Sequence, residues 1–256
     1  MASKRKVGLF MTINILFPVL NEHLRLEKGI DKCVAYMRSN VKIPYKLTIV
    51  DNGSDDDTPE IARKLEQKYD EVEYVRIEEK GVGIAFKTGV LRCTADIVGY
   101  MDIDLSTDLS FLSKTIELFE KKPRLQYVNG SRFSKDSDTK GRKWYRKITS
   151  AGLVFILKAV FHMKATDALC GFTFLRTETA KKLVKQCSDD KGWFYTVELL
   201  LRAERQGINI YDMPIEWTED YDTTVNVPKT IKNYIIRIIK LKHMFIQEKK
   251  YAILHR

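Results

Sequence analysis

Short apolar runs alternate with amphipathic stretches along the first half of the chain. Five runs of four to six residues are rich in β-branched and aromatic residues and are followed by polar or turn-forming residues, which is typical of buried strands. Between them, apolar residues recur at helical spacing, and Thr58-Pro59 is typical of a helix start. This alternation predicts an α/β fold in which helices flank a mostly parallel sheet. The predicted strands are residues 13–17, 46–50, 72–77, 97–101 and 126–129.

The C-terminal segment, residues 228–256, has a different pattern. Apolar residues such as Ile231, Ile235 and Ile238 recur there at helical spacing, with Lys232 and Arg237 between them. This periodicity predicts a basic amphipathic helix. The chain shows no linker before this segment. We therefore predict one domain over residues 1–227, followed directly by the amphipathic helical segment.

The chain has 256 residues and a formal net charge of +10, which is concentrated in two segments. Residues 132–147 contain seven basic and two acidic residues, and residues 228–256 contain eight basic residues and one acidic residue. Both segments adjoin apolar runs, and a basic amphipathic helix is typical of proteins that bind a membrane surface. The alternative is a helix that packs on the core and has a solvated charged face. No RNA-binding motif or recognition-helix pattern occurs, so we expect no nucleic-acid partner.

The apolar runs and the cysteines bear on the compartment in which the protein works. No apolar run reaches the ~20 residues that a membrane-spanning helix needs, and the first ten residues do not resemble a secretory signal. The four cysteines are scattered without a CxxC pair, so we expect neither a disulfide framework nor a zinc site. We therefore expect a cytoplasmic protein that is peripheral on the cytoplasmic face of a membrane.

Acidic residues follow the predicted strands, at the edge where an α/β sheet binds ligands. Asp102 and Asp104 follow the fourth strand, and residues two apart in a strand share a face, so both carboxylates can address one site. Such a pair can bind a hard cation that bridges to a diphosphate, although D-x-D is also common in ordinary surface turns. Asp51 can accept hydrogen bonds from a nucleoside or cap the next helix. Gly81 and Gly83 permit a ligand to approach the backbone closely.

Together these motifs resemble those of glycosyltransferase family 2, whose members have the Rossmann-like GT-A fold and transfer sugars from nucleotide donors. The resemblance covers FPVLNE, IVDNGSDDDT, KGVGIAFKTG and MDIDLS, in the family's order and approximate spacing. Further along, VNGSRF, TDALCGFTFLR, WFYTVELLLRAERQG and MPIEWTE are similar to the polyprenyl- and dolichyl-phosphate sugar synthases. The D-x-x-C-G-F run is most similar to the dolichyl-phosphate β-glucosyltransferase branch of that group, which also includes the dolichyl-phosphate mannose synthases.

The resemblance implies a divalent cation, Mg²⁺ or Mn²⁺, which Asp102, Asp104 and Ser106 would hold against the donor diphosphate. The implied donor is a nucleotide diphosphate sugar, with a UDP-sugar favoured over GDP-mannose. Asp104 and Arg132 are then the residues that we expect to act in catalysis. The residues implied for binding of the nucleotide sugar are Pro18, Glu22, Asp51, Gly81, Asp102, Asp167 and Trp193.

The implied acceptor is a polyprenyl or dolichyl phosphate lipid, whose phosphate Arg132 would bind with Arg142 or Arg146. Arginine binds phosphate bidentately, so an arginine-rich segment suits this acceptor better than a neutral glycan. A phosphate monoester is largely dianionic at neutral pH and needs no general base. The C-terminal helix or a small transmembrane partner subunit would keep the protein at the membrane.

Two other functions stay open. A family 2 enzyme that glycosylates a sugar hydroxyl in polysaccharide assembly would need a carboxylate base, for which Glu198 and Asp167 are the candidates. A catalytically silent subunit that binds nucleotide sugar or lipid is the second alternative. The presence of both Asp102 and Asp104 argues against a silent subunit.

The chain departs from the family pattern at two places. Thr196 stands where an acid is usual, and residues 223–225 read Thr-Thr-Val where a basic residue is usual. Lys229 is a candidate substitute for that basic residue. These departures concern the identity of the sugar and the binding of the donor diphosphate rather than the fold.

Overall fold

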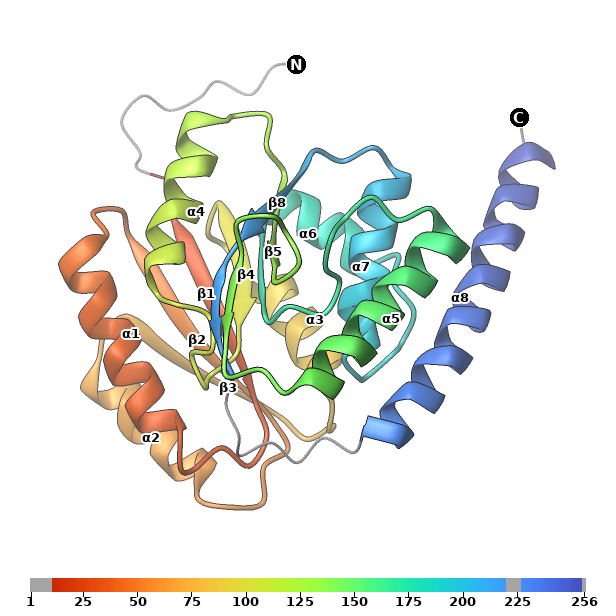
Figure 1. The fold of residues 1–256 in the computed structure, drawn as a ribbon. Coiled ribbons are helices and arrows are strands. Elements are labelled where there is room, and N and C mark those ends of the chain that lie inside the picture. Colours follow the sequence, from red (N-terminus) through yellow and green to blue (C-terminus); the bar gives the residue numbers. More distant parts are fainter. Residues whose placement is uncertain (1–10, 220–226, 255–256) are drawn as a thin grey trace.

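A seven-stranded sheet runs through the middle of the molecule (Figure 1). The structure is a computed structural model and describes residues 11–219 and 227–254. All five predicted strands are confirmed, with ends that differ by two residues or fewer. The strands are β1 (Ile13–Val19), β2 (Tyr45–Asn52), β3 (Val72–Ile77), β4 (Ile97–Met101), β5 (Tyr127–Ser131), β6 (Asp138–Lys140), β7 (Phe172–Arg176), β8 (Ile210–Pro214) and β9 (Glu216–Thr218).

The strand order in the large sheet is β3-β2-β1-β4-β7-β5-β8, and β6 pairs separately with β9. Strand β7 runs antiparallel to β4 and β5, whereas the other neighbouring pairs are parallel. The predicted mostly parallel sheet is therefore confirmed, with one antiparallel strand that the sequence pattern did not predict. Because Phe172 pairs with Met101, the residues just before β7 lie beside those just after β4.

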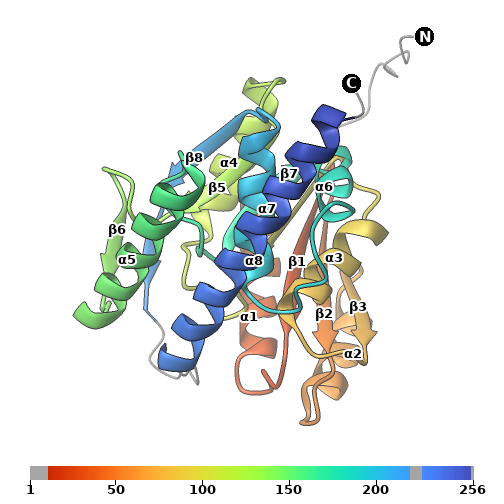
Figure 2. The ribbon, with the colours of Figure 1, turned by 90° about the vertical axis from the view of Figure 1, so that its right-hand side faces the viewer.

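Helices cover both faces of the sheet (Figures 1 and 2). Each face has its own apolar core. Residues of α1, α2 and α4 pack on one face, and residues of α3, α6 and α7 pack on the other. The four cysteines are buried within these cores. The helices are α1 (Leu26–Asn40), α2 (Thr58–Lys68), α3 (Val82–Arg92), α4 (Ser110–Lys121), α5 (Trp144–Phe161), α6 (Thr177–Val184), α7 (Phe194–Arg205) and α8 (Val227–Leu254).

The predicted C-terminal helix is confirmed as α8, and one side of it packs on the domain. Ile238, Leu241 and Phe245 are buried in the core shared with α7. The Arg202 guanidinium of α7 also pairs with Glu248 at 3.0 Å. This side of α8 therefore has the core-packing role that the alternative interpretation predicts. In the part of the chain that the structure describes, no helix is long and apolar enough to cross a membrane.

We predict that Leu241→Ala lowers the free energy of unfolding by about 2–5 kcal/mol, because Leu241 is 2% exposed and its truncation leaves a cavity beneath α8. The matched change Ile239→Ala removes an aliphatic side chain that is 64% exposed, so we expect about 0.5 kcal/mol or less. Urea unfolding followed by circular dichroism measures both. Equal effects of the two substitutions would show that α8 does not pack as described.

Candidate functional site

Two carboxylates lie at the carboxyl end of β4, where the loop approaches the start of β7. Asp102 is partly buried and its backbone N–H donates to the Gly171 carbonyl at 3.2 Å. A Cβ atom at Gly171 would lie only 1.8 Å from the Asp102 Oδ2 atom, so the position of this carboxylate requires a glycine there. Asp104 is exposed and accepts a hydrogen bond from the Ser106 N–H at 2.9 Å. The structure thus brings the three predicted metal ligands into one short loop.

The electrostatics of Asp102 indicate a site that suits a cation. Burial raises the pKa of Asp102, and repulsion by Asp104 and Glu22 raises it further, while Arg132 acts in the opposite direction. A hard cation between Asp102 and Asp104 would offset that repulsion. Among the described residues, no group of three His, Cys, Asp or Glu side chains is arranged to hold a metal ion by itself. A Mg²⁺-like ion held by two carboxylates, with its other ligands from phosphate oxygens and water, fits this donor set.

Arg132 is held rigidly by Asp167 close to these carboxylates. Its Nε donates to Asp167 Oδ2 at 2.7 Å and its Nη2 donates to Asp167 Oδ1 at 3.1 Å and to the Leu169 carbonyl at 2.9 Å. Asp167 is fully buried, so it is not exposed to a ligand. It acts on a ligand by orienting Arg132. Among the residues that the structure describes, none accepts a hydrogen bond from Nη1 of Arg132. That edge of the guanidinium remains for a ligand.

Arg142 and Arg146 lie together and share the carboxylate of Glu219. Arg146 pairs with Glu219 directly, and the Arg142 Nε lies 4.0 Å from the same carboxylate. Burial and the neighbouring Arg132 lower the pKa of Arg142 to about 10. Three arginines therefore gather around two acids, and an anion bound among them would relieve their mutual repulsion. This arrangement brings together the three residues predicted to bind the acceptor phosphate.

The predicted nucleotide-binding residues lie at the ends of the neighbouring strands. Pro18 lies in β1 beside β2, and Asp51, near the end of β2, is fully buried. Asp51 Oδ2 accepts hydrogen bonds from the Tyr74 hydroxyl at 2.9 Å and from Arg76 at 2.8 Å. Its Oδ1 atom accepts from the Ser54 N–H at 2.9 Å. Asp51 thus stabilises the turn after β2 rather than the start of α2, whose N-cap residue is Asp57. Any contact that Asp51 makes with a nucleoside shares the carboxylate with these donors.

Gly81 directly precedes α3, and a hydrogen bond links it to the end of β2. Its N–H donates to the Asn52 side-chain oxygen at 2.8 Å, and its φ of 145° lies in the region that favours glycine. A Cβ atom at Gly81 would lie 2.3 Å from the Lys191 carbonyl, and the Gly83 N–H donates to that carbonyl at 2.8 Å. The glycine turn is therefore packed directly against the segment that leads to Trp193.

The segment before Trp193 is also held by α8. Asp190 is buried, and its Oδ2 atom lies 2.8 Å from the Nε of Arg237, while its Oδ1 atom accepts from the Gly192 N–H at 2.8 Å. Trp193 is 43% exposed, so its ring is available to a ligand. The C-terminal helix thus contributes a residue that positions the loop beside the predicted donor site.

Neither candidate base of the polysaccharide alternative is positioned to take a proton from a glycan. Glu198 is buried, pairs with Arg202 at 2.8 Å and accepts from the Ser188 N–H at 2.9 Å. Asp167 is committed to Arg132, as described above. Thr196, which replaces an expected acid, is buried and its hydroxyl donates to the Trp193 carbonyl at 2.9 Å. Residues 223–225 and the Lys229 side chain lie outside the described part of the structure.

Sequence reasoning missed several residues that shape the site. Tyr74 and Arg76 left no signal, because β3 reads as an ordinary strand and its pairing with β2 is needed to bring them to Asp51. Gly171 stood within the quoted D-x-x-C-G-F run, but only the pairing of β4 with β7 shows why it is a glycine. The pairing of Arg237 with Asp190 also left no signal in the sequence. Arg237 is one of many basic residues on its helix, and Asp190 lies in a polar loop.

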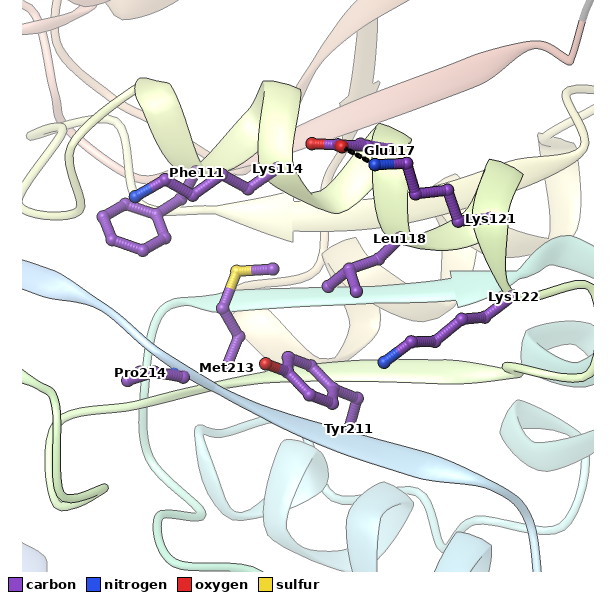
Figure 3. Close-up of a pocket in the computed structure, with 9 residues that line it drawn as sticks. All are labelled: Phe111, Lys114, Glu117, Leu118, Lys121, Lys122, Tyr211, Met213 and Pro214. Atoms are coloured by element: carbon purple, nitrogen blue, oxygen red, sulfur yellow. Dashed lines mark hydrogen bonds and ion pairs between the residues drawn. The ribbon is translucent and has the colours of Figure 1, made fainter.

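A separate groove of about 360 Å³ lies between α4 and β8 (Figure 3). Its lining is partly apolar, and Lys122 extends toward the Tyr211 ring while Lys121 pairs with Glu117. None of the predicted site residues lines it, so it is not part of the candidate site. Its lining is Phe111, Lys114, Glu117, Leu118, Lys121, Lys122, Tyr211, Met213 and Pro214.

Comparison with known proteins places this geometry in a family. Residues 14–184 match the model of glycosyl transferase family 2. Over 221 residues the chain is 25% identical to the glycosyltransferase AglD of Haloferax volcanii. This match covers 86% of this chain but only 35% of AglD. The chain therefore spans about a third of the length of that relative. It is also 26% identical over 230 residues to the dolichyl-phosphate beta-glucosyltransferase ALG5A of Trichomonas vaginalis, covering 86% of this chain and 70% of that protein.

A solved structure supports the fold. The glucosyl-3-phosphoglycerate synthase of Mycobacterium tuberculosis, in complex with Mn²⁺, UDP-glucose and phosphoglyceric acid, superposes with a TM-score of 0.68 and 18% identity. The match covers 91% of this chain and 80% of that chain. At this identity the likeness concerns the fold, and it confirms the predicted GT-A architecture.

We predict that Gly171→Ala displaces the Asp102 carboxylate, because the added methyl group would overlap it. Overpacking of this kind costs about 1–3 kcal/mol of stability, and the displaced ligand lowers apparent Mn²⁺ affinity about tenfold or more. Titration of Mn²⁺ in the presence of a nucleoside diphosphate measures the affinity. Gly152→Ala is the control, since a methyl group there meets nothing within 4 Å. Equal Mn²⁺ affinity in the two variants would contradict the proposed position of Asp102.

The pair of Arg132 and Asp167 predicts a defined pH dependence of stability. Burial by itself raises the pKa of Asp167, yet the contacts with Arg132 hold it below the ordinary value. The pair therefore contributes fully above the unfolded-state pKa of about 3.9, and its contribution is lost as pH falls through the lower folded-state pKa.

Asp167→Asn should then be less stable than the wild type by about 3–5 kcal/mol at pH 7, because Arg132 is left buried without its counter-ion. Urea unfolding between pH 7 and pH 3 measures the difference in unfolding free energy between the two proteins. We expect this difference to stay constant down to about pH 5 and to narrow only below about pH 4. A difference that stays constant down to pH 3, or that widens as pH falls, would contradict the lowered pKa of Asp167.

Proposed function

Because the chain belongs to glycosyl transferase family 2, we propose that it transfers a hexose from a nucleotide diphosphate sugar to a polyprenyl or dolichyl phosphate at a membrane surface. A UDP-sugar is the favoured donor over GDP-mannose. The similarity to a dolichyl-phosphate beta-glucosyltransferase supports both the lipid phosphate acceptor and a glucosyl donor. Asp104 and Arg132 are the proposed catalytic residues.

The contrast between the candidate bases and the arginines carries this proposal. Glu198 and Asp167 are both committed to buried ion pairs, so neither is placed to deprotonate a sugar hydroxyl. Arg132 and Arg142, in contrast, lie close enough for Arg132 to lower the pKa of Arg142. A site with crowded guanidinium groups, in which both of these candidate bases are already paired, suits an acceptor that is already ionised. A lipid phosphate has that property, since its second pKa is near ~6.

The proposed reaction is a direct displacement with inversion at the anomeric carbon. A phosphate oxygen of the acceptor attacks that carbon, and the bond from the carbon to the donor diphosphate breaks. The electron pair of this bond leaves with the nucleoside diphosphate, and no proton is transferred. Arg132, oriented by Asp167, and Arg142 hold the acceptor phosphate in line with the bond that breaks.

Asp102, Asp104 and Ser106 would hold Mg²⁺ or Mn²⁺ in this site. When bound, such an ion neutralises charge on the departing diphosphate. On the donor side, Glu22, Asp51 and the Gly81 turn would bind the nucleoside and the diphosphate. The exposed ring of Trp193, on the loop packed against Gly81, would contact the sugar.

A transfer assay tests the proposal. The protein is incubated with labelled UDP-glucose, other UDP-sugars or GDP-mannose, and with either polyprenyl phosphate in detergent or soluble glycans. We expect label in the lipid phosphate with a UDP-sugar and Mn²⁺. Asp104→Asn should lower the rate about 100-fold or more, whereas Asp70→Asn, an exposed carboxylate outside the site, should leave it unchanged.

Each alternative predicts a different outcome of this assay. Label in the glycan alone would favour the polysaccharide enzyme and overturn the lipid phosphate acceptor. Binding of nucleotide sugar without transfer or hydrolysis would favour the silent subunit.

A further inference from the structure

One face of α5 exposes large apolar side chains to solvent. Trp144, Ile148 and Phe155 are 73%, 62% and 73% exposed. They are spaced four and seven residues apart, so they share one side of the helix. Val154 and Leu157, on the opposite side, are buried in the core of the domain. The helix is therefore apolar on both sides, and only one of them packs against the protein.

Helix α8 has the same property. Ile235, Ile239 and Ile246 are 47%, 64% and 44% exposed, although Leu241 and Phe245 on the other side are buried. Lys242 follows Ile235 by seven residues and Ile239 by three, and it precedes Ile246 by four. The three isoleucines and Lys242 therefore lie on one side of the helix. These isoleucines form a second apolar stripe, distinct from the side that packs on α7.

The two stripes border one pair of helices. The Lys242 Nζ donates to the Val160 carbonyl of α5 at 2.6 Å, so the isoleucine side of α8 turns toward α5. Phe161 and Phe245 also meet with their ring centroids 5.8 Å apart. Figures 1 and 2 both show α5 and α8 running side by side. We call the exposed apolar residues of these two stripes the α5/α8 surface: Trp144, Ile148, Phe155, Ile231, Ile235, Ile239 and Ile246.

The charges around this surface indicate an anionic partner. Helix α5 has three basic residues and no acidic one, and α8 has seven basic residues and one acidic one. A second copy of the chain would bring two strongly basic surfaces together, and like charges repel. An anionic surface would instead attract the lysines while the apolar side chains leave water.

We propose that the α5/α8 surface docks onto an anionic lipid bilayer, with both helices lying in the plane of the interface. Apolar residues on one side of a helix and lysines around them are the features that bind helices to such an interface. Trp144 and Tyr145 stand at the start of α5, and aromatic rings of this kind favour the headgroup region. The surface is larger than the C-terminal helix alone, and α5 supplies its most exposed rings.

This position also explains how a lipid acceptor reaches the site, a step that rests on the proposed function. Arg146 lies in the first turn of α5 and pairs with Glu219. Arg142 lies beside the same carboxylate and donates to the Ser150 hydroxyl of α5. The predicted phosphate site thus lies at the end of α5 that carries Trp144. A prenyl chain in the bilayer would run along α5 while its phosphate stays among the arginines.

Binding to lipid vesicles tests the docking surface. The full-length protein is sedimented with vesicles of phosphatidylcholine alone or mixed with phosphatidylglycerol, without polyprenyl phosphate or nucleotide sugar. We expect binding to the anionic vesicles that weakens as salt is added. Phe155→Glu should lower the partition coefficient at least about tenfold. Leu91→Glu, which introduces the same charge at an exposed apolar residue of α3, should bind like the wild type apart from a small effect of charge.

Fluorescence gives a second measurement that does not depend on substitution of a charge. Brominated lipids should quench part of the tryptophan emission, and Trp144→Phe should remove that quenching. Circular dichroism and thermal unfolding of each variant confirm that it is folded.

Three outcomes would overturn the proposal. They are failure of the wild type to bind anionic vesicles, equal binding by the glutamate variants at Phe155 and Leu91, or a dimer in sedimentation that Phe155→Glu dissociates. The first would favour a transmembrane partner, and the third a second copy on this surface. Because the vesicles contain no substrate, vesicle binding can fail while transfer to detergent-solubilised acceptor persists, and the reverse also holds.

Discussion

Charge balance at the end of β4 is the constraint on which the rest of the site depends. Asp102 is partly enclosed and lies near Asp104 and Glu22, so its ionised form is disfavoured unless positive charge is fixed nearby. Arg132 supplies part of that charge from inside the protein. Arg132 can remain there only because Asp167 pairs with it through two hydrogen bonds, since an unpaired buried guanidinium is strongly unfavourable. The pair therefore orients a cation toward the carboxylates before any ligand binds.

The antiparallel strand β7 makes this arrangement possible. It lies between β4 and β5, so the loop before it passes the carboxylates at one sheet edge and reaches Arg132 after β5. Gly171 in that loop leaves space for the Asp102 carboxylate, and Asp167 lies four residues earlier. A parallel strand in this position would present its other end to the site. The single reversal of strand direction thus brings together residues from β4, β5 and the loop before β7.

Helix α8 connects the proposed lipid surface to the donor side of the site. One side of the helix packs in the core, and its isoleucines border α5. From the same helix, Arg237 pairs with Asp190, whose segment packs against the glycine turn at Gly81. The proposed lipid contact and the loop that carries Trp193 therefore share one rigid element. A displacement of α8 would act on the donor site through this ion pair.

The sequence by itself determined the elements and the residue types. Short runs rich in β-branched and aromatic residues predicted the five strands, and helical periodicity predicted the amphipathic C-terminal helix, because burial leaves a local signature in the sequence. The polar cluster after β4 could also be predicted locally, because Asp102 and Asp104 stand two residues apart directly after a predicted strand. Only the tertiary structure decided which side chains meet. The pairing of Arg132 with Asp167, of Asp51 with Arg76 and of Arg237 with Asp190 joins residues 25 to 47 positions apart. Such contacts depend on strand order and helix docking, which no local pattern specifies.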